Sequence, residues 1–136
     1  MTSFRTEADV LEGTDFTLVG AITMAVAGQP TPVFIVQSDV TGQITLAIYE
    51  AGNATPIYGP ASLMLSTVIF NTPQLDGFWE DEDSIGYNFR TPIRQVDVGA
   101  GVLKGGRRYT IIVSIPTATA GILHPLFVPN IIPLQI

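Results

Sequence analysis

The sequence predicts an all-β fold, a single β-sandwich domain of about seven or eight strands. Short segments rich in β-branched and aromatic residues recur along the 136 residues, and turn-forming glycine, proline or asparagine separates them. Several segments alternate apolar and polar residues, which is typical of a sheet with one buried face. The chain has neither heptads nor an internal repeat, and its length is that of one domain.

The first half of the chain begins with a polar segment and continues with strand patterns. Residues 1–15 carry four acids, and we expect an N-terminal arm there, followed by a sandwich domain of residues 16–136. Residues 16–26 are the first strand candidate. The apolar run 33–36 predicts a short buried strand, and residues 44–49 alternate with period two.

The second half contains the strongest strand pattern, at residues 108–115. Residues 61–70 fit a long strand or a short helix, and the β-branched and aromatic residues at their end favour a strand. Another strand is expected through residues 87–93. The last strand covers residues 126–128 and 131–136, and its prolines place it at a sheet edge or a bulge, because proline cannot donate to a ladder.

Alternation on the two best strands predicts which side chains face the core. A side chain on every second position of a half-buried strand points inward. The residues expected to do so are Leu46, Ile48, Tyr109, Ile111 and Val113.

Tyr109 also belongs to the most specific local pattern of the chain. Leu103 and a Gly-Gly pair precede this tyrosine, which opens the penultimate strand, and that is the layout of the tyrosine corner of immunoglobulin-like sandwiches. We expect its hydroxyl to bond to the backbone near Leu103 or Lys104. The alternative is an unrelated tyrosine at the start of a strand.

Four motifs and the terminal strand together resemble small immunoglobulin-like domains of tailed-bacteriophage virion proteins. The motifs are Ile-Thr-Leu-Ala-Ile-Tyr at 44–49, Asp-Gly-Phe-Trp at 76–79, Ile-Gly-Tyr-Asn-Phe-Arg at 85–90 and Leu-Lys-Gly-Gly-Arg-Arg-Tyr at 103–109. The resemblance runs from about Phe16 to the end of the chain. It implies an immunoglobulin-like sandwich with an assembly or attachment role on a baseplate, tail or capsid, and it carries over no catalytic residues.

The composition indicates a surface that is covered by other subunits. Only 13% of the residues are charged, 46% are hydrophobic and the mean hydropathy is +0.38, whereas an ordinary domain carries about 25% charged residues. The alternative is an unusually well-buried monomer. A net charge of -6 argues against nucleic acid as a partner. The chain lacks an apolar run long enough for a transmembrane helix, so we expect no membrane partner.

The only tryptophan, Trp79, lies in an acidic stretch. The acids of this stretch are Asp76, Glu80, Asp81, Glu82 and Asp83. Paired carboxylates hydrolyse glycosides when a cleft holds them about 5–10 Å apart, which adjacent acids in a surface loop rarely achieve. The aspartates partly fit the ligand pattern of calcium, although the spacing is not that of an EF-hand. A solvated loop is the plainer interpretation, and whether it binds calcium stays open.

Catalytic machinery is not visible in the sequence, and we predict that the chain is not an enzyme. The only histidine, His124, precedes Pro125, and we expect it to be structural. The chain contains no Gly-x-Ser-x-Gly elbow. One histidine without cysteine cannot supply the three or four ligands of a zinc site, so no cofactor is expected.

These observations favour a structural virion protein of a tailed bacteriophage, whose partners are other copies of itself and other virion proteins. The alternative is a carbohydrate-binding or adhesive module, with a glycan stacked on an exposed Trp79 beside Asp81 and Asn88. A buried Trp79 would instead be structural, like Tyr109. The residues expected at the interface are Phe127, Ile131, Ile132, Leu134 and Ile136, with Arg107 and Arg108 meeting the acidic arm.

Overall fold

The computed structural model describes residues 5–76 and 86–134, and its elements are mostly strands. The strands are β1 (Arg5–Leu11), β2 (Phe16–Gly20), β3 (Thr23–Met24), β4 (Val33–Phe34), β5 (Ile44–Glu50), β6 (Tyr58–Leu63), β7 (Ile69–Gln74), β8 (Tyr87–Ile93), β9 (Tyr109–Thr117), β10 (Gly121–Leu123) and β11 (Leu126–Ile132). The helical segments are single turns, namely η1 (Gln37–Asp39), α1 (Leu65–Val68) and α2 (Gln95–Val98). The predicted all-β class is confirmed.

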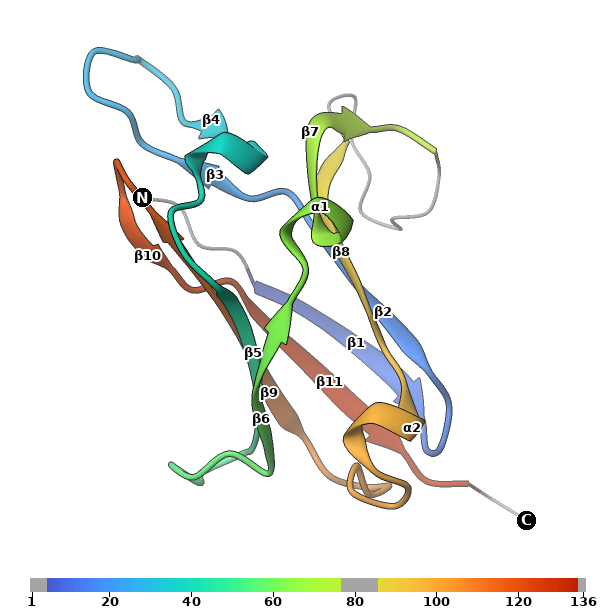
Figure 1. Ribbon diagram of the computed structural model, residues 1–136. Helices are drawn as coiled ribbons and strands as arrows, with labels where there is room; N and C mark the ends of the chain where they lie inside the picture. The colour runs from blue at the N-terminus through green and yellow to red at the C-terminus, as the bar shows by residue number, and fades with distance from the viewer. Residues whose placement is uncertain (1–4, 77–85, 135–136) are drawn as a thin grey trace.

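The strands form one large and one small sheet, plus a short hairpin (Figure 1). The large sheet has the order β1-β11-β9-β5-β6, and β10 pairs with the end of β9. The small sheet has the order β2-β8-β7, and β3 pairs with β4. Buried apolar side chains from both sheets belong to one hydrophobic cluster, so the core lies between the sheets.

The predicted inward-facing residues are all buried, which confirms the register expected for β5 and β9. Side chains along β9 alternate between buried and half-buried from Tyr109 to Thr117. Within the core cluster, Leu46 and Ile48 of β5 stand opposite Val113 and Ile111 of β9. Each cross-strand pair therefore removes two large apolar side chains from water.

The tyrosine-corner hydrogen bond is also confirmed. The hydroxyl of Tyr109 accepts a hydrogen bond from the backbone N–H of Lys104 at 2.8 Å and donates one to the carbonyl of Val102 at 3.3 Å. The ring itself is buried in the core. The short separation between Val102 and Tyr109 in the sequence therefore brings backbone partners to a buried hydroxyl that has lost its contact with water.

The N-terminal segment is not an arm over the residues described. Arg5–Leu11 is an edge strand, β1, which runs parallel to β11 of the same chain. The turn after it is anchored as well, because Glu12 accepts hydrogen bonds from the N–H groups of Gly105 at 2.7 Å and Leu134 at 3.4 Å. Asp15 accepts one from the N–H of Gln95 at 2.8 Å, at the start of α2. Residues 5–15 therefore pack on the rest of the described chain.

The last strand does not lie at the sheet edge. β11 is enclosed between β1 and β9, and its ladder with β9 is interrupted around Pro129. Leu126 and Phe127 pair with β9, and beyond the proline a single bridge joins Asn130 to Arg108. The ring nitrogen of Pro129 cannot donate, and the gap in the ladder accommodates it inside the sheet.

Two expected strands are divided in the structure. The segment 16–26 contains β2 and β3, which belong to different sheets. The segment 61–70 contains the end of β6, the turn α1 and the start of β7. Because β6 belongs to the large sheet and β7 to the small one, the chain must change layers there, and α1 supplies that change.

Candidate functional site

The predicted interface residues fall into two groups. Phe127 and Ile131 are only 2% and 3% exposed and belong to the core, so their assignment to an interface is wrong. Val128 and Pro129 between them are buried as well, so most of β11 is enclosed by the fold. Ile132 and Leu134 are 43% and 53% exposed, and Ile136 lies outside the described residues.

The exposed members of this set adjoin a third apolar side chain that the sequence analysis did not single out. Leu11 is 47% exposed and is the register partner of Ile132 in the parallel pair. The backbone N–H of Glu12 donates to the carbonyl of Ile132 at 2.9 Å, which keeps the two strand ends together. We call Leu11, Ile132 and Leu134 the terminal patch. It lies where β1 and β11 end, beside the C-terminus (Figure 1).

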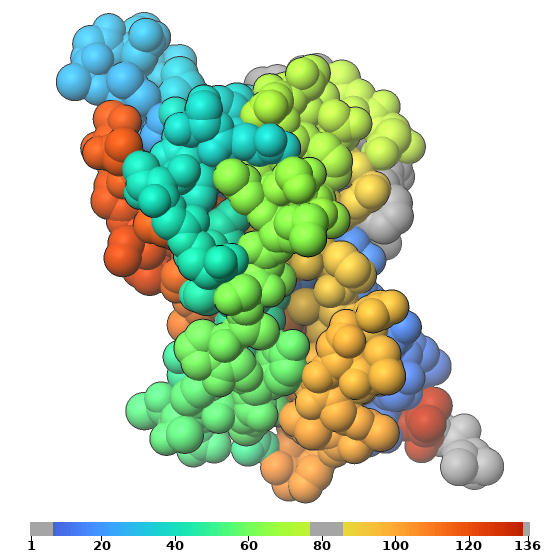
Figure 2. Space-filling view, viewed as in Figure 1, coloured from blue at the N-terminus to red at the C-terminus, as the bar shows by residue number. Residues whose placement is uncertain are grey.

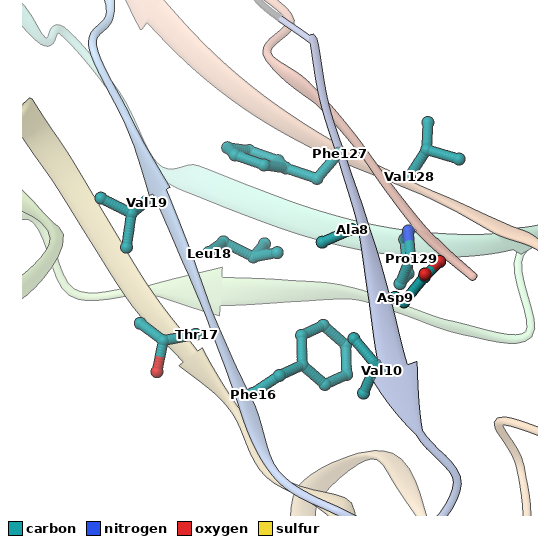
Figure 3. A pocket seen from close by; sticks show the side chains of 10 residues that line it. All are labelled: Ala8, Asp9, Val10, Phe16, Thr17, Leu18, Val19, Phe127, Val128 and Pro129. Carbon is teal, nitrogen blue, oxygen red and sulfur yellow. The ribbon is translucent and has the colours of Figure 1, made fainter. Parts of the chain in front are cut away.

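Next to the terminal patch, an apolar groove opens between the edge strands β1 and β2. It has a volume of about 180 Å³. Figure 3 shows Ala8 and Val10 of β1 pointing toward Phe16 and Leu18 of β2, while Asp9 points away from the groove. The space between the two sheets is therefore not closed by side chains where β1 faces β2.

The two arginines expected at the interface are engaged within the chain. Arg107 pairs with Glu50 at 2.6 Å, and Arg108 pairs with Glu7 of β1 at 2.5 Å. The N-terminal segment thus meets Arg108 as expected, but as a strand of the same sheet. These side chains are largely exposed, so each pair contributes about 0–1 kcal/mol to stability.

The acidic stretch with Trp79 lies mostly outside the described residues, and so do Glu80, Asp81, Glu82 and Asp83. The described member, Asp76, accepts a hydrogen bond from the hydroxyl of Tyr87 at 2.8 Å and lies 4.0 Å from Arg90. Burial, and then the hydrogen bond to Asp76, raise the pKa of Tyr87 above its usual value. The start of this stretch is therefore tied to β8.

Asn88, expected beside a sugar on Trp79, is instead a buried structural residue. Its side-chain oxygen accepts a hydrogen bond from the N–H of Ile22 at 2.7 Å. Its amide nitrogen donates to the carbonyl of Ile22 at 2.9 Å and to that of Ile35 at 3.0 Å. Asn88 therefore fastens the β3–β4 hairpin to β8, and no solvent-facing ligand can reach it.

The only histidine lies at the surface, in contact with a serine. His124 Nδ1 is 3.2 Å from the hydroxyl oxygen of Ser114. A catalytic Ser–His pair also needs a group that orients the ring, and within the described residues no other side chain forms a hydrogen bond with the His124 ring. The same described part of the chain contains no cluster of three or more His, Asp or Glu residues suited to a metal ion.

Two further properties of the chain are the character of its helices and its similarity to known proteins. Within residues 5–76 and 86–134, no helix has the length and apolar character needed to cross a membrane. The chain matches no family model, no curated protein and no solved structure.

Proposed function

We propose that the chain is an immunoglobulin-like β-sandwich that acts as a non-enzymatic assembly module in the virion of a tailed bacteriophage. Its strand order supports the fold part of this proposal. The run β11-β9-β5-β6 corresponds to strands G, F, C and C′ of such domains, and β2-β8-β7 corresponds to B, E and D. Tyr109 then opens the strand equivalent to F, where the tyrosine corner is found.

The terminal patch is the observation that carries the assembly role. Leu11, Ile132 and Leu134 are exposed together at one end of the large sheet, next to the open groove between β1 and β2. Apolar side chains gathered beside an apolar groove are typical of a protein contact surface. The low charge content of the chain favours an apolar contact, because few charges need to be desolvated. The proposed occupant is a second copy of this chain.

Sedimentation velocity of the purified chain over a range of concentrations tests this contact. The wild type should associate, and the double variant Ile132→Asp and Leu134→Asp should sediment as a monomer, because each carboxylate would have to be buried unpaired. Met64→Asp is the matched control, since Met64 is exposed on the turn before α1 and lies outside the patch. A wild type that stays monomeric, or a control that dissociates equally, refutes the terminal patch as the contact.

The virion role is tested with particles. The labelled chain should co-sediment with purified tailed-phage particles that lack it, and the patch variant should not. A wild-type chain that self-associates but remains in the supernatant would refute the virion role and leave the self-association standing.

A carbohydrate-binding or adhesive module is the second candidate. Its original support, an exposed Trp79, lies outside the described residues. A different feature favours it, namely a cleft beside β6 that is lined by hydroxyl groups.

A further inference from the structure

A second hollow lies between β6 and the segment formed by β8 and α2. Its volume is about 410 Å³. Figure 2 shows the green residues of β6 facing the orange residues of β8 and α2 across a seam. Its walls include the core residues Leu46, Ile93 and Val98, so the deep part of the cleft is apolar.

One buried hydroxyl in this cleft has no hydrogen-bond partner among the described residues. Thr91 of β8 lines the cleft and is only 3% exposed. It is one of three buried polar residues of the described chain, and the side chains of the other two, Asn88 and Thr117, are fully engaged in hydrogen bonds. No hydrogen bond to the hydroxyl of Thr91 is found within the described residues. A buried hydroxyl without a partner is unfavourable, so a polar group that entered the cleft would gain a hydrogen bond from Thr91.

The rim of the cleft adds a further hydroxyl group and one neutralised ion pair. Tyr58 of β6 lines the cleft opposite β8, and no hydrogen bond to its hydroxyl is found within the described part of the chain. Across from this tyrosine, the Nε of Arg94 donates to Asp97 at 3.1 Å. That contact uses one donor of the guanidinium and one carboxylate oxygen, so donors and an acceptor remain for a ligand.

We propose that this cleft binds a neutral, hydroxyl-rich ring of the size of a monosaccharide. An anion is disfavoured because Asp97 already neutralises Arg94 and the chain carries a net charge of -6. A metal ion is disfavoured because Asp97 is the one carboxylate among the residues that line the cleft, and it is already paired with Arg94. A purely apolar ligand would leave the hydroxyl of Thr91 unsatisfied.

A sugar ring fits both halves of the cleft. Its C–H face packs on the apolar wall and on the ring of Tyr58, while its hydroxyls bond to Thr91 and to the Arg94–Asp97 pair. The inference rests on the second candidate function, and it is independent of self-association through the terminal patch. Failure of one therefore leaves the other intact.

Amide chemical-shift titration of the full chain tests the site. The probes are D-glucose, D-galactose and N-acetyl-D-glucosamine, with D-glucuronate as the charged counterpart. At least one neutral sugar should give saturable shifts confined to residues 58–63 and 91–98. The proposal is overturned if none of the neutral sugars does so, in which case the cleft holds only water, or if D-glucuronate binds more tightly than D-glucose.

Two variants make the assignment specific. Thr91→Val keeps the shape and removes the hydroxyl, so it should weaken the sugar about fivefold or more, the worth of one hydrogen bond. Its melting temperature should equal or exceed that of the wild type, because no bond within the fold is lost. Thr110→Val, on the half-exposed face of β9, is the matched control and should bind like the wild type.

The second variant, Asp97→Ala, removes an exposed carboxylate and should also weaken binding, whereas Glu7→Ala, which breaks an exposed ion pair of β1, should not. A Thr91→Val protein that binds normally, or one that melts clearly below the wild type, overturns the proposal. The first result would mean that the hydroxyl does not touch the sugar, and the second that the fold itself uses it.

Discussion

Replacement of Asn88 by leucine should destabilise the protein far more than its single amide group suggests. Asn88 is fully buried, and its side chain bonds to the N–H of Ile22 and to the carbonyls of Ile22 and Ile35. Leucine has the same branched outline and is somewhat larger, so the substitution removes these bonds without opening a cavity. The effect then measures polar satisfaction rather than packing.

The expected loss of unfolding free energy depends on which backbone groups are left without any hydrogen-bond partner. The carbonyl of Ile22 keeps the hydrogen bond from the N–H of Ile35 at 3.1 Å. The N–H of Ile22 and the carbonyl of Ile35 retain no partner within the described residues. Each buried unsatisfied group costs about 1–3 kcal/mol, so Asn88→Leu should lower the free energy of unfolding by about 2–6 kcal/mol. That is a large share of the roughly 5–15 kcal/mol that stabilises a typical domain.

Urea denaturation followed by circular dichroism measures this loss. Asn53→Leu is the control, because Asn53 lies in an exposed turn and its amide contacts only Glu50, at 3.4 Å. The control should change stability by less than about 0.5 kcal/mol. A loss below about 1 kcal/mol for Asn88→Leu would show that the β3–β4 hairpin is held by other contacts, and the reasoning above would be wrong.

Three further substitutions test the core, the tyrosine corner and the backbone, each by denaturation. Ile111→Ala should cost about 2–5 kcal/mol, since the residue is fully buried, and a loss under about 0.5 kcal/mol would contradict the register of β9. Tyr109→Phe should cost about 1 kcal/mol for its hydroxyl bonds, and an unchanged stability would make them irrelevant. Gly86→Ala should cost more than Gly28→Ala. Both glycines have positive φ, but only at Gly86 would the new Cβ meet the backbone, so equal costs would contradict this packing.

The core and the tyrosine corner could be predicted because their signals are local. Alternation along a strand reveals which side chains point inward, and the spacing from Leu103 to Tyr109 places the hydroxyl beside the backbone just before it. The role of Asn88 could not be predicted, since its partners Ile22 and Ile35 lie far away in the chain. Nothing near Asn88 in the sequence distinguishes it from a surface asparagine.

The sequence did not predict β1 because its acidic residues made the segment look like a polar arm. Glu7 and Asp9 are exposed, while the alternate residues Ala8 and Val10 face the groove. Pairing with β11 also joins opposite ends of the chain, which no local pattern reveals. The same pairing places the last strand inside the sheet, although its prolines indicated a sheet edge or a bulge.

The two candidate sites lie at opposite edges of the large sheet, because β1 and β6 are its two edge strands. The terminal patch and the groove lie at β1, and the hydroxyl-lined cleft lies at β6. A second copy bound at one edge therefore leaves the other open. Arg107 and Arg108, which were expected at the interface, already pair with Glu50 and Glu7 of the same chain, so self-association should be driven by apolar contact and should strengthen with added sulfate. Sugar binding at a neutral cleft should be nearly insensitive to salt, and this difference separates the two activities in one preparation.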